Sequence, residues 1–132
     1  MDGVLLETYA RIFNRKRQII TSNFSINFND IKLLRGNVRL ENKKLVLYDE
    51  GTFLIFFKIN NVLDLPFKLS LNNILSDKGV YNYSNNCITC MTIESTDTFP
   101  TTLNVVNTSL FDVELLDDEN ENVSLTCMKM CQ

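Results

Sequence analysis

The chain has 132 residues, of which 45% are hydrophobic, and a formal net charge of −3. This length supports one domain with its own core, and the composition argues against disorder. The mild acidity gives no reason to expect a nucleic acid or an anionic membrane surface as partner. The longest apolar run, residues 53–57, is far shorter than the roughly 20 residues of a membrane-spanning helix, so no membrane insertion is expected.

The N-terminal residues do not have the pattern of a secretory signal peptide, because a basic segment and a long apolar segment are both missing. One helix is conceivable over residues 4–13, where Leu5, Tyr9 and Ile12 have helical spacing. A strand from Tyr9 onward competes with it and is favoured. We therefore expect an N-terminal extension over 1–8 and one domain over 9–132.

The remaining segments are short, have β-type patterns and are separated by polar turns. In chain order they are 19–29, 36–51 with a turn at 41–44, 51–60, 67–73, 87–95, 101–107, 111–116 and 123–130. About eight to ten short strands with closely spaced turns indicate an all-β sandwich or barrel. In 111–116, Phe111, Val113 and Leu115 are expected on one face.

The segment 51–60, GTFLIFFKIN, is apolar on both faces. Alternation places Phe53, Ile55, Phe57 and Ile59 on one side and Leu54 with Phe56 on the other. The larger set is predicted to line the core. Leu54 and Phe56 are predicted to contact a neighbouring subunit, although loops of the same chain could also cover them.

Two further segments have apolar residues on both faces, namely 101–107 with adjacent Val105 and Val106, and 123–130. Segments 67–73 and 111–116 are amphipathic in the ordinary way. This contrast predicts two sheets, one facing water and one facing another copy of the chain. The candidate residues for that subunit interface are Leu54, Phe56, Val105, Met128 and Met130.

The order of three pieces resembles the C-terminal domain of BclA-like, collagen-like glycoproteins of the bacterial spore surface. The pieces are YARIFN…QII, then INFNDIKLLRGNVRLENKKLVLYDEGTFLIFFKINNV, and finally TLNVVNTSLFDVELLDDENENVSLTCMKM. The similarity covers about Tyr9 to Met130. No Gly-X-Y tract precedes the domain, the chain has four cysteines where the family has few, and Asn73 replaces the glycine of an L-N-G turn.

The resemblance implies a jelly-roll sandwich of two antiparallel sheets, of the tumour necrosis factor and complement globular-head type, that forms a homotrimer. It implies that 51–60, 101–107 and 123–130 share the axis-side sheet, with 67–73 and 111–116 in the outer sheet. The expected function is a non-enzymatic structural head domain on a spore surface or exosporium. The alternative is a trimeric receptor-binding or adhesin tip of a phage fibre or surface appendage, and other surface-layer proteins are possible further partners.

Four cysteines raise the question of a zinc site, because Cys87 and Cys90 form C-x-x-C and Cys127 and Cys131 form C-x3-C. In extended strands each pair is roughly 10 to 13 Å apart, which exceeds the reach of chelation and of a disulfide. We therefore expect buried thiols at Cys90 and Cys127 and no metal or cofactor. Cys131 is a candidate for an intermolecular disulfide in an oxidising compartment.

Other motifs have simpler explanations than a functional site. The basic run 11–18 and the acidic run 117–122 are typical of solvated turns. Four N-x-[ST] sequons begin at Asn23, Asn82, Asn107 and Asn122 and are interpreted as chance occurrences. With no histidine and no nucleophile or phosphate-loop motif, the sequence does not indicate an enzyme.

Overall fold

The computed structural model describes residues 7–62, 67–97 and 100–130, and these contain thirteen β-strands and no helix. The strands are β1 (Tyr9–Asn14), β2 (Gln18–Ile20), β3 (Asp30–Arg35), β4 (Val38–Glu41), β5 (Lys44–Leu47), β6 (Gly51–Ile59), β7 (Phe67–Leu71), β8 (Ile74–Leu75), β9 (Val80–Ser84), β10 (Cys87–Thr96), β11 (Thr101–Asn107), β12 (Val113–Leu115) and β13 (Val123–Lys129). The strand predicted from Tyr9 is confirmed as β1, and β3, β8 and β9 lie outside the predicted segments.

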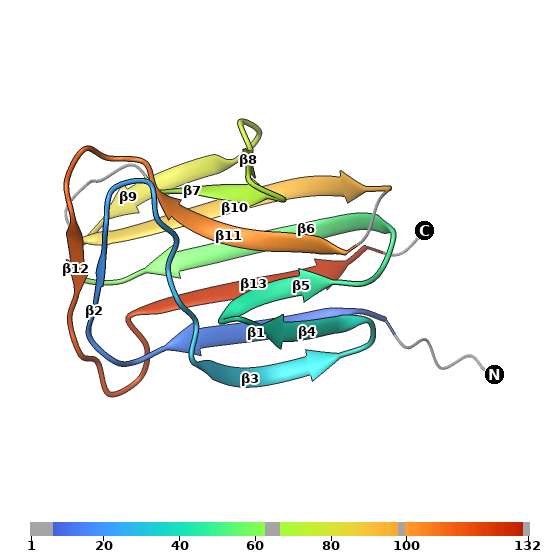
Figure 1. The fold of residues 1–132 in the computed structure, drawn as a ribbon, viewed down its shortest axis with the longest axis horizontal. Coiled ribbons are helices and arrows are strands. Elements are labelled where there is room, and N and C mark those ends of the chain that lie inside the picture. The colour runs from blue at the N-terminus through green and yellow to red at the C-terminus, as the bar shows by residue number, and fades with distance from the viewer. Residues whose placement is uncertain (1–6, 63–66, 98–99, 131–132) are drawn as a thin grey trace.

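Two antiparallel sheets form a sandwich (Figure 1). The first has the order β3-β1-β13-β6-β10-β9 and the second the order β4-β5-β11-β7-β8, while β12 and β2 form a small sheet across one end. Some neighbours are consecutive hairpins, such as β4 with β5, whereas others, such as β1 with β13 and β5 with β11, come from distant parts of the chain. The predicted all-β sandwich is confirmed.

The core lies between the two sheets and follows the alternation of each strand. In β6, Phe53, Ile55, Phe57 and Ile59 are at most 1% exposed, and they pack into a cluster with residues of both sheets. The prediction that this set lines the core is therefore confirmed. Leu54 and Phe56 point to the other side of the sheet and are half-buried.

The sheet assignment of 101–107 was wrong. β11 lies in the five-stranded sheet between β5 and β7, not beside β6 and β13. Val105 is fully buried in the core and is therefore removed from the interface candidates, whereas its neighbour Val106 is half-buried on the outer side. Two adjacent valines fit either orientation, so the alternation of this short strand could not decide which one points inward.

The assignment of 111–116 to an outer sheet is also corrected. Only β12 is a strand there, and it pairs with β2 in the small sheet across the end of the sandwich. Val113 and Leu115 are buried as expected, but Phe111 is 71% exposed because it lies in the loop before β12.

Three hairpins turn through pairs of residues in the left-handed region: Asn42–Lys43, Asn72–Asn73 and Asn85–Asn86. Both members of each pair have φ between 49° and 69°, which is the backbone of a type I′ turn. Asparagine tolerates this conformation better than other non-glycine residues. The abundant asparagines therefore explain how a chain with four glycines makes its tight turns.

Asparagines also form a buried network where β1 and β13 meet. Asn14 and Asn122 are at most 1% exposed, and the side-chain nitrogen of Asn14 donates to Oδ1 of Asn122 at 3.0 Å. Asn122 in turn donates to the carbonyl oxygens of Lys16 and Leu116. These bonds fix the loops around the ends of the two strands, because a buried amide is costly unless its hydrogen bonds are made.

A partly buried ion pair lies at the opposite end of the sheet. Asp49 accepts a hydrogen bond from Thr8 Oγ1 at 2.7 Å and contacts Lys129 Nζ at 3.1 Å. Burial acts to raise the pKa of Asp49, but the hydrogen bonds and positive charge of its partners outweigh it and lower the pKa. Gly51 allows this arrangement, since a Cβ there would lie 2.8 Å from Lys129 Cε.

We expect Asp49→Asn to lower the free energy of unfolding at neutral pH by about 1 to 3 kcal/mol. Because the pKa of Asp49 is lowered by folding, its stabilisation is full above the unfolded pKa of about 4 and is lost as the pH falls through the folded pKa. Urea unfolding at neutral and acidic pH should show the gap between the variant and the wild type narrowing in acid. Asp112→Asn, at an exposed loop position, is the control, and an equal gap at both pH values would contradict the prediction.

Candidate functional site: the outer face of the six-stranded sheet

The strand register brings the outward side chains of the six-stranded sheet into rows. In one row Tyr9, Met128, Leu54 and Ile93 lie side by side on β1, β13, β6 and β10. In the next row Arg11, Thr126, Phe56, Met91 and Val80 lie on β1, β13, β6, β10 and β9. Directly opposite residues of antiparallel strands point to the same face, so the two rows form one surface.

Six apolar side chains are contiguous on this surface, and we call them the apolar face: Leu54, Phe56, Val80, Met91, Ile93 and Met128. Leu54 and Phe56 are half-buried, while Val80 is 74%, Ile93 52% and Met91 48% exposed. A contiguous apolar patch at the centre of a sheet is typical of a protein contact site. Beside it, Nη2 of Arg11 lies 2.9 Å from both carboxylate oxygens of Glu121, so the charge of Arg11 is paired.

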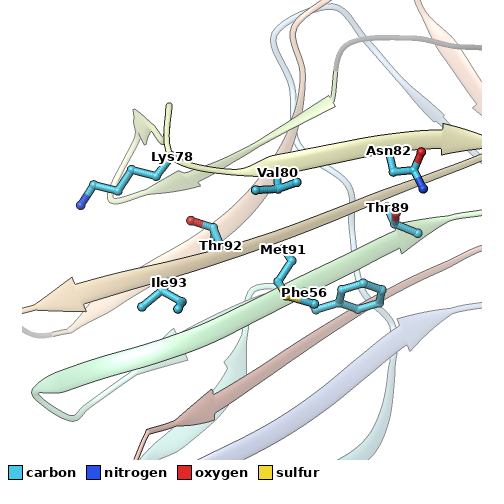
Figure 2. A pocket seen from close by; sticks show the side chains of 8 residues that line it. All are labelled: Phe56, Lys78, Val80, Asn82, Thr89, Met91, Thr92 and Ile93. Carbon is cyan, nitrogen blue, oxygen red and sulfur yellow. The ribbon is translucent and has the colours of Figure 1, made fainter.

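A shallow hollow of about 530 Å³ lies on this surface where β9 begins, at Val80. Figure 2 shows Phe56, Val80, Met91 and Ile93 on three neighbouring strands around it, with Lys78 at its margin. β10 pairs with β6 from Ile88 to Thr96 but with β9 only from Cys87 to Met91. β9 begins only at Val80, opposite Met91, which leaves this space beside the second half of β10.

The outer face of the five-stranded sheet is different in character. Its outward positions include Arg39, Lys44, Lys68, Thr102 and Asn104, with Val46 and Val106 between them. The predicted contrast between strands with one apolar face and strands with two is therefore found for β6 and β13. The outward faces of these two strands lie side by side on the six-stranded sheet.

The interface candidates separate into three groups in the structure. Leu54, Phe56 and Met128 come together on the apolar face. Met130 follows β13 and is 38% exposed. Val105 is in the core, and the sequence analysis missed Val80, Met91 and Ile93. The alternation of residues 87–95 could have revealed Met91 and Ile93. Both point to the face of the strand opposite that of the buried Cys90, Thr92 and Glu94.

The cysteines do not converge on a metal site. Cys90 is buried in the core while Cys87 lies on the other face of β10, with its thiol 3.2 Å from Asn60 Oδ1. Cys127 is buried on β13, and β6 separates it from β10. Burial raises the pKa of Cys127 to about 12 and also raises that of Cys90, so both are protonated at neutral pH. Cys131 lies outside the described residues, and among those described no cluster of metal-ligating side chains is found.

Among the described residues, Glu94 on β10 is a buried carboxylate with two hydroxyl partners. Glu94 accepts hydrogen bonds from Ser76 at 2.5 Å and Thr92 at 2.7 Å, and Lys78 Nζ lies 4.0 Å from its other oxygen. Both hydroxyls donate to the carboxylate, so it has its partners within the chain. The arrangement joins the segment after β8 to β10 and stabilises this edge of the sandwich.

The basic run 11–18 is a turn only at residues 15–17, because residues 11–14 belong to β1 and Gln18 begins β2. Arg17 pairs with Glu114, and its backbone N–H donates to Asp117, so the basic and acidic runs are tied to each other. Asn107 and Asn122 of the sequons are buried and use their side-chain nitrogens as hydrogen-bond donors, which makes them unavailable for glycosylation in the folded chain. No helix of the described residues has the length and apolarity needed to cross a membrane.

No known protein family matches the chain, and no curated protein resembles it significantly. The site therefore has to be interpreted from its own geometry.

Proposed function

We propose that this chain is a non-enzymatic structural head domain that assembles as a homotrimer through the apolar face. The setting we propose is the surface of a bacterial spore, as the resemblance to collagen-like exosporium glycoproteins implies. The contiguous apolar face on the six-stranded sheet is the observation that supports the proposal. Its exposure to water is unfavourable, and the same face of another copy of the chain would cover it.

A second copy of the chain is the occupant that the surface fits best. The face lies at the centre of a regular sheet, and the charge of the adjacent Arg11 is paired with that of Glu121. The interleaved sheet order and the apolar character of the sheet that contains β1 and β13 support a subunit arrangement of the tumour necrosis factor type. In such a trimer these sheets meet around the three-fold axis.

A receptor-binding or adhesin tip is the second candidate, and a different observation favours it. Leu110 and Phe111 are 88% and 71% exposed in the loop between β11 and β12, away from the apolar face. A structural head has no need for bulky apolar side chains at such a position.

Light scattering coupled to size exclusion tests the assembly. We expect a particle of three times 15.2 kDa at micromolar concentration. A monomeric mass under these conditions would contradict the trimer and would leave the apolar face for a different partner. A dimeric mass would retain self-association and reject the three-fold arrangement.

A further inference from the structure

Two neighbouring loops at one end of the sandwich expose three bulky apolar side chains, which we call the apolar tip: Phe24, Leu110 and Phe111. Phe24 is 65% exposed and lies in the loop after β2, beside the loop that carries the other two. Backbone bonds join the loops, with Asn23 N–H donating to the carbonyl of Asn107 at 2.7 Å and Asn107 N–H donating to that of Phe24 at 2.9 Å.

A buried polar network shapes the tip. Asn107 is fully buried, and its side-chain nitrogen donates to the carbonyl oxygens of Ile20 at 3.0 Å and Phe111 at 2.7 Å. Its Oδ1 accepts from both the N–H and the hydroxyl of Ser109. The apolar side chains are thus displayed by a loop with a fixed backbone.

Several backbone groups of the tip are bonded within the chain. Phe111 N–H donates to Ser109 Oγ at 3.3 Å, and its carbonyl oxygen accepts from the side-chain nitrogen of Asn107 at 2.7 Å. Phe24 N–H donates to the carbonyl of Thr21, and the carbonyl of Ser109 accepts from Ser22 Oγ. The backbone groups of an exposed loop ordinarily form hydrogen bonds with water. A backbone group that is bonded within the chain instead costs little free energy when it enters an apolar medium.

The charges of the two loops and the location of the tip indicate which apolar medium the tip could enter. Residues 21–25 and 108–112 contain no lysine or arginine and a single acidic residue, Asp112, so an anionic surface is not favoured. All three side chains are more than 60% exposed, so they are accessible to a partner from outside. β1 begins and β13 ends at the opposite end of the sandwich, so the tip is remote from both (Figure 1).

From these observations we infer that the apolar tip inserts into the interfacial region of an electrically neutral lipid bilayer without crossing it. The short apolar runs of the sequence exclude spanning, but they do not bear on shallow insertion of a loop. The inference goes beyond the proposed assembly and does not rest on it. In an oligomer several tips would bind one vesicle together and strengthen the attachment.

Cosedimentation of the purified full chain with phosphatidylcholine vesicles tests the inference. We expect the wild-type chain to bind, and Leu110→Ser combined with Phe111→Ser to weaken the partition by at least about tenfold. Ile74→Ser is the matched control, because Ile74 is 73% exposed but lies on β8, outside the two loops of the tip. This variant should bind vesicles like the wild type. Thermal unfolding of each variant confirms that it is folded, as expected for exposed positions.

Three results would overturn the inference: no binding of the wild type at about millimolar lipid, equal binding of the double variant, or binding that requires phosphatidylglycerol and disappears with added salt. Phe56→Asp distinguishes vesicle binding from trimer formation, since it changes the apolar face and leaves the tip intact. A monomer of that variant should still bind vesicles, more weakly than the trimer but above the double tip variant.

Discussion

Phe56→Asp is expected to convert the trimer into folded monomers. Phe56 lies between Thr126 and Met91 in the middle of the apolar face, so its replacement places a carboxylate in the centre of a contact that excludes water. An unpaired buried charge costs about 3 to 5 kcal/mol, and in a trimer this cost is repeated in each subunit. The position is half-exposed in the single chain, so the monomer can solvate the new charge and keep its fold.

The measurement is the mass by light scattering, together with the melting temperature. Phe111→Asp provides a matched control, because it makes the same chemical change at a more exposed phenylalanine outside the apolar face. That control should remain a trimer. If both variants keep the trimeric mass, the face does not form the contact, and the assembly has to be sought on another surface.

Ile55→Ala is expected to destabilise the fold by about 2 to 5 kcal/mol while the oligomer keeps its mass. Ile55 is the neighbour of Phe56 on the opposite side of β6, is 1% exposed, and lies between Cys127 and Thr92 on the adjacent strands. Its truncation leaves a cavity between two close-packed sheets, which cannot collapse fully around the missing atoms.

Chemical denaturation of Ile55→Ala beside the wild type measures this loss, and Leu54→Ala serves as the comparison on the outer side. A smaller loss for Ile55→Ala than for Leu54→Ala in the isolated monomer would mean that the two sides of β6 are assigned the wrong way round.

Alternation divides the residues of β6 into two sets, and the length of the larger set indicated which of the two faces the core. Four consecutive inward positions from Phe53 to Ile59 are all large and apolar, whereas the outward set is interrupted by Thr52 and Lys58. In β11 the inward set is Leu103 and Val105, and one additional valine at 106 obscures the pattern. Sheet membership depends on pairing with distant strands, which local alternation does not contain.

The buried asparagines were the main omission in the sequence analysis. Asn14 follows Ala10 and Ile12 in the inward positions of β1, and Asn107 follows Leu103 and Val105 in those of β11. Alternation could have placed both inside, but asparagine is common in turns and both lie at strand ends. The apolar tip was missed for the same reason, because its geometry depends on the hydrogen bonds of Asn107 with Ser109.

The pairing of the first strand with the last has a consequence for biosynthesis. β13 lies between β1 and β6, so each of these strands lacks its partner on that side until residues 123–129 have left the ribosome. The three tight hairpins can close as soon as they emerge, because their partners are adjacent in sequence. The six-stranded sheet is completed only after synthesis of nearly the whole chain, and until then the apolar β6 presents an open edge to other nascent chains. Translation speed and chaperone access during this interval should therefore affect the yield of soluble protein more strongly than they would for a fold whose paired strands follow each other.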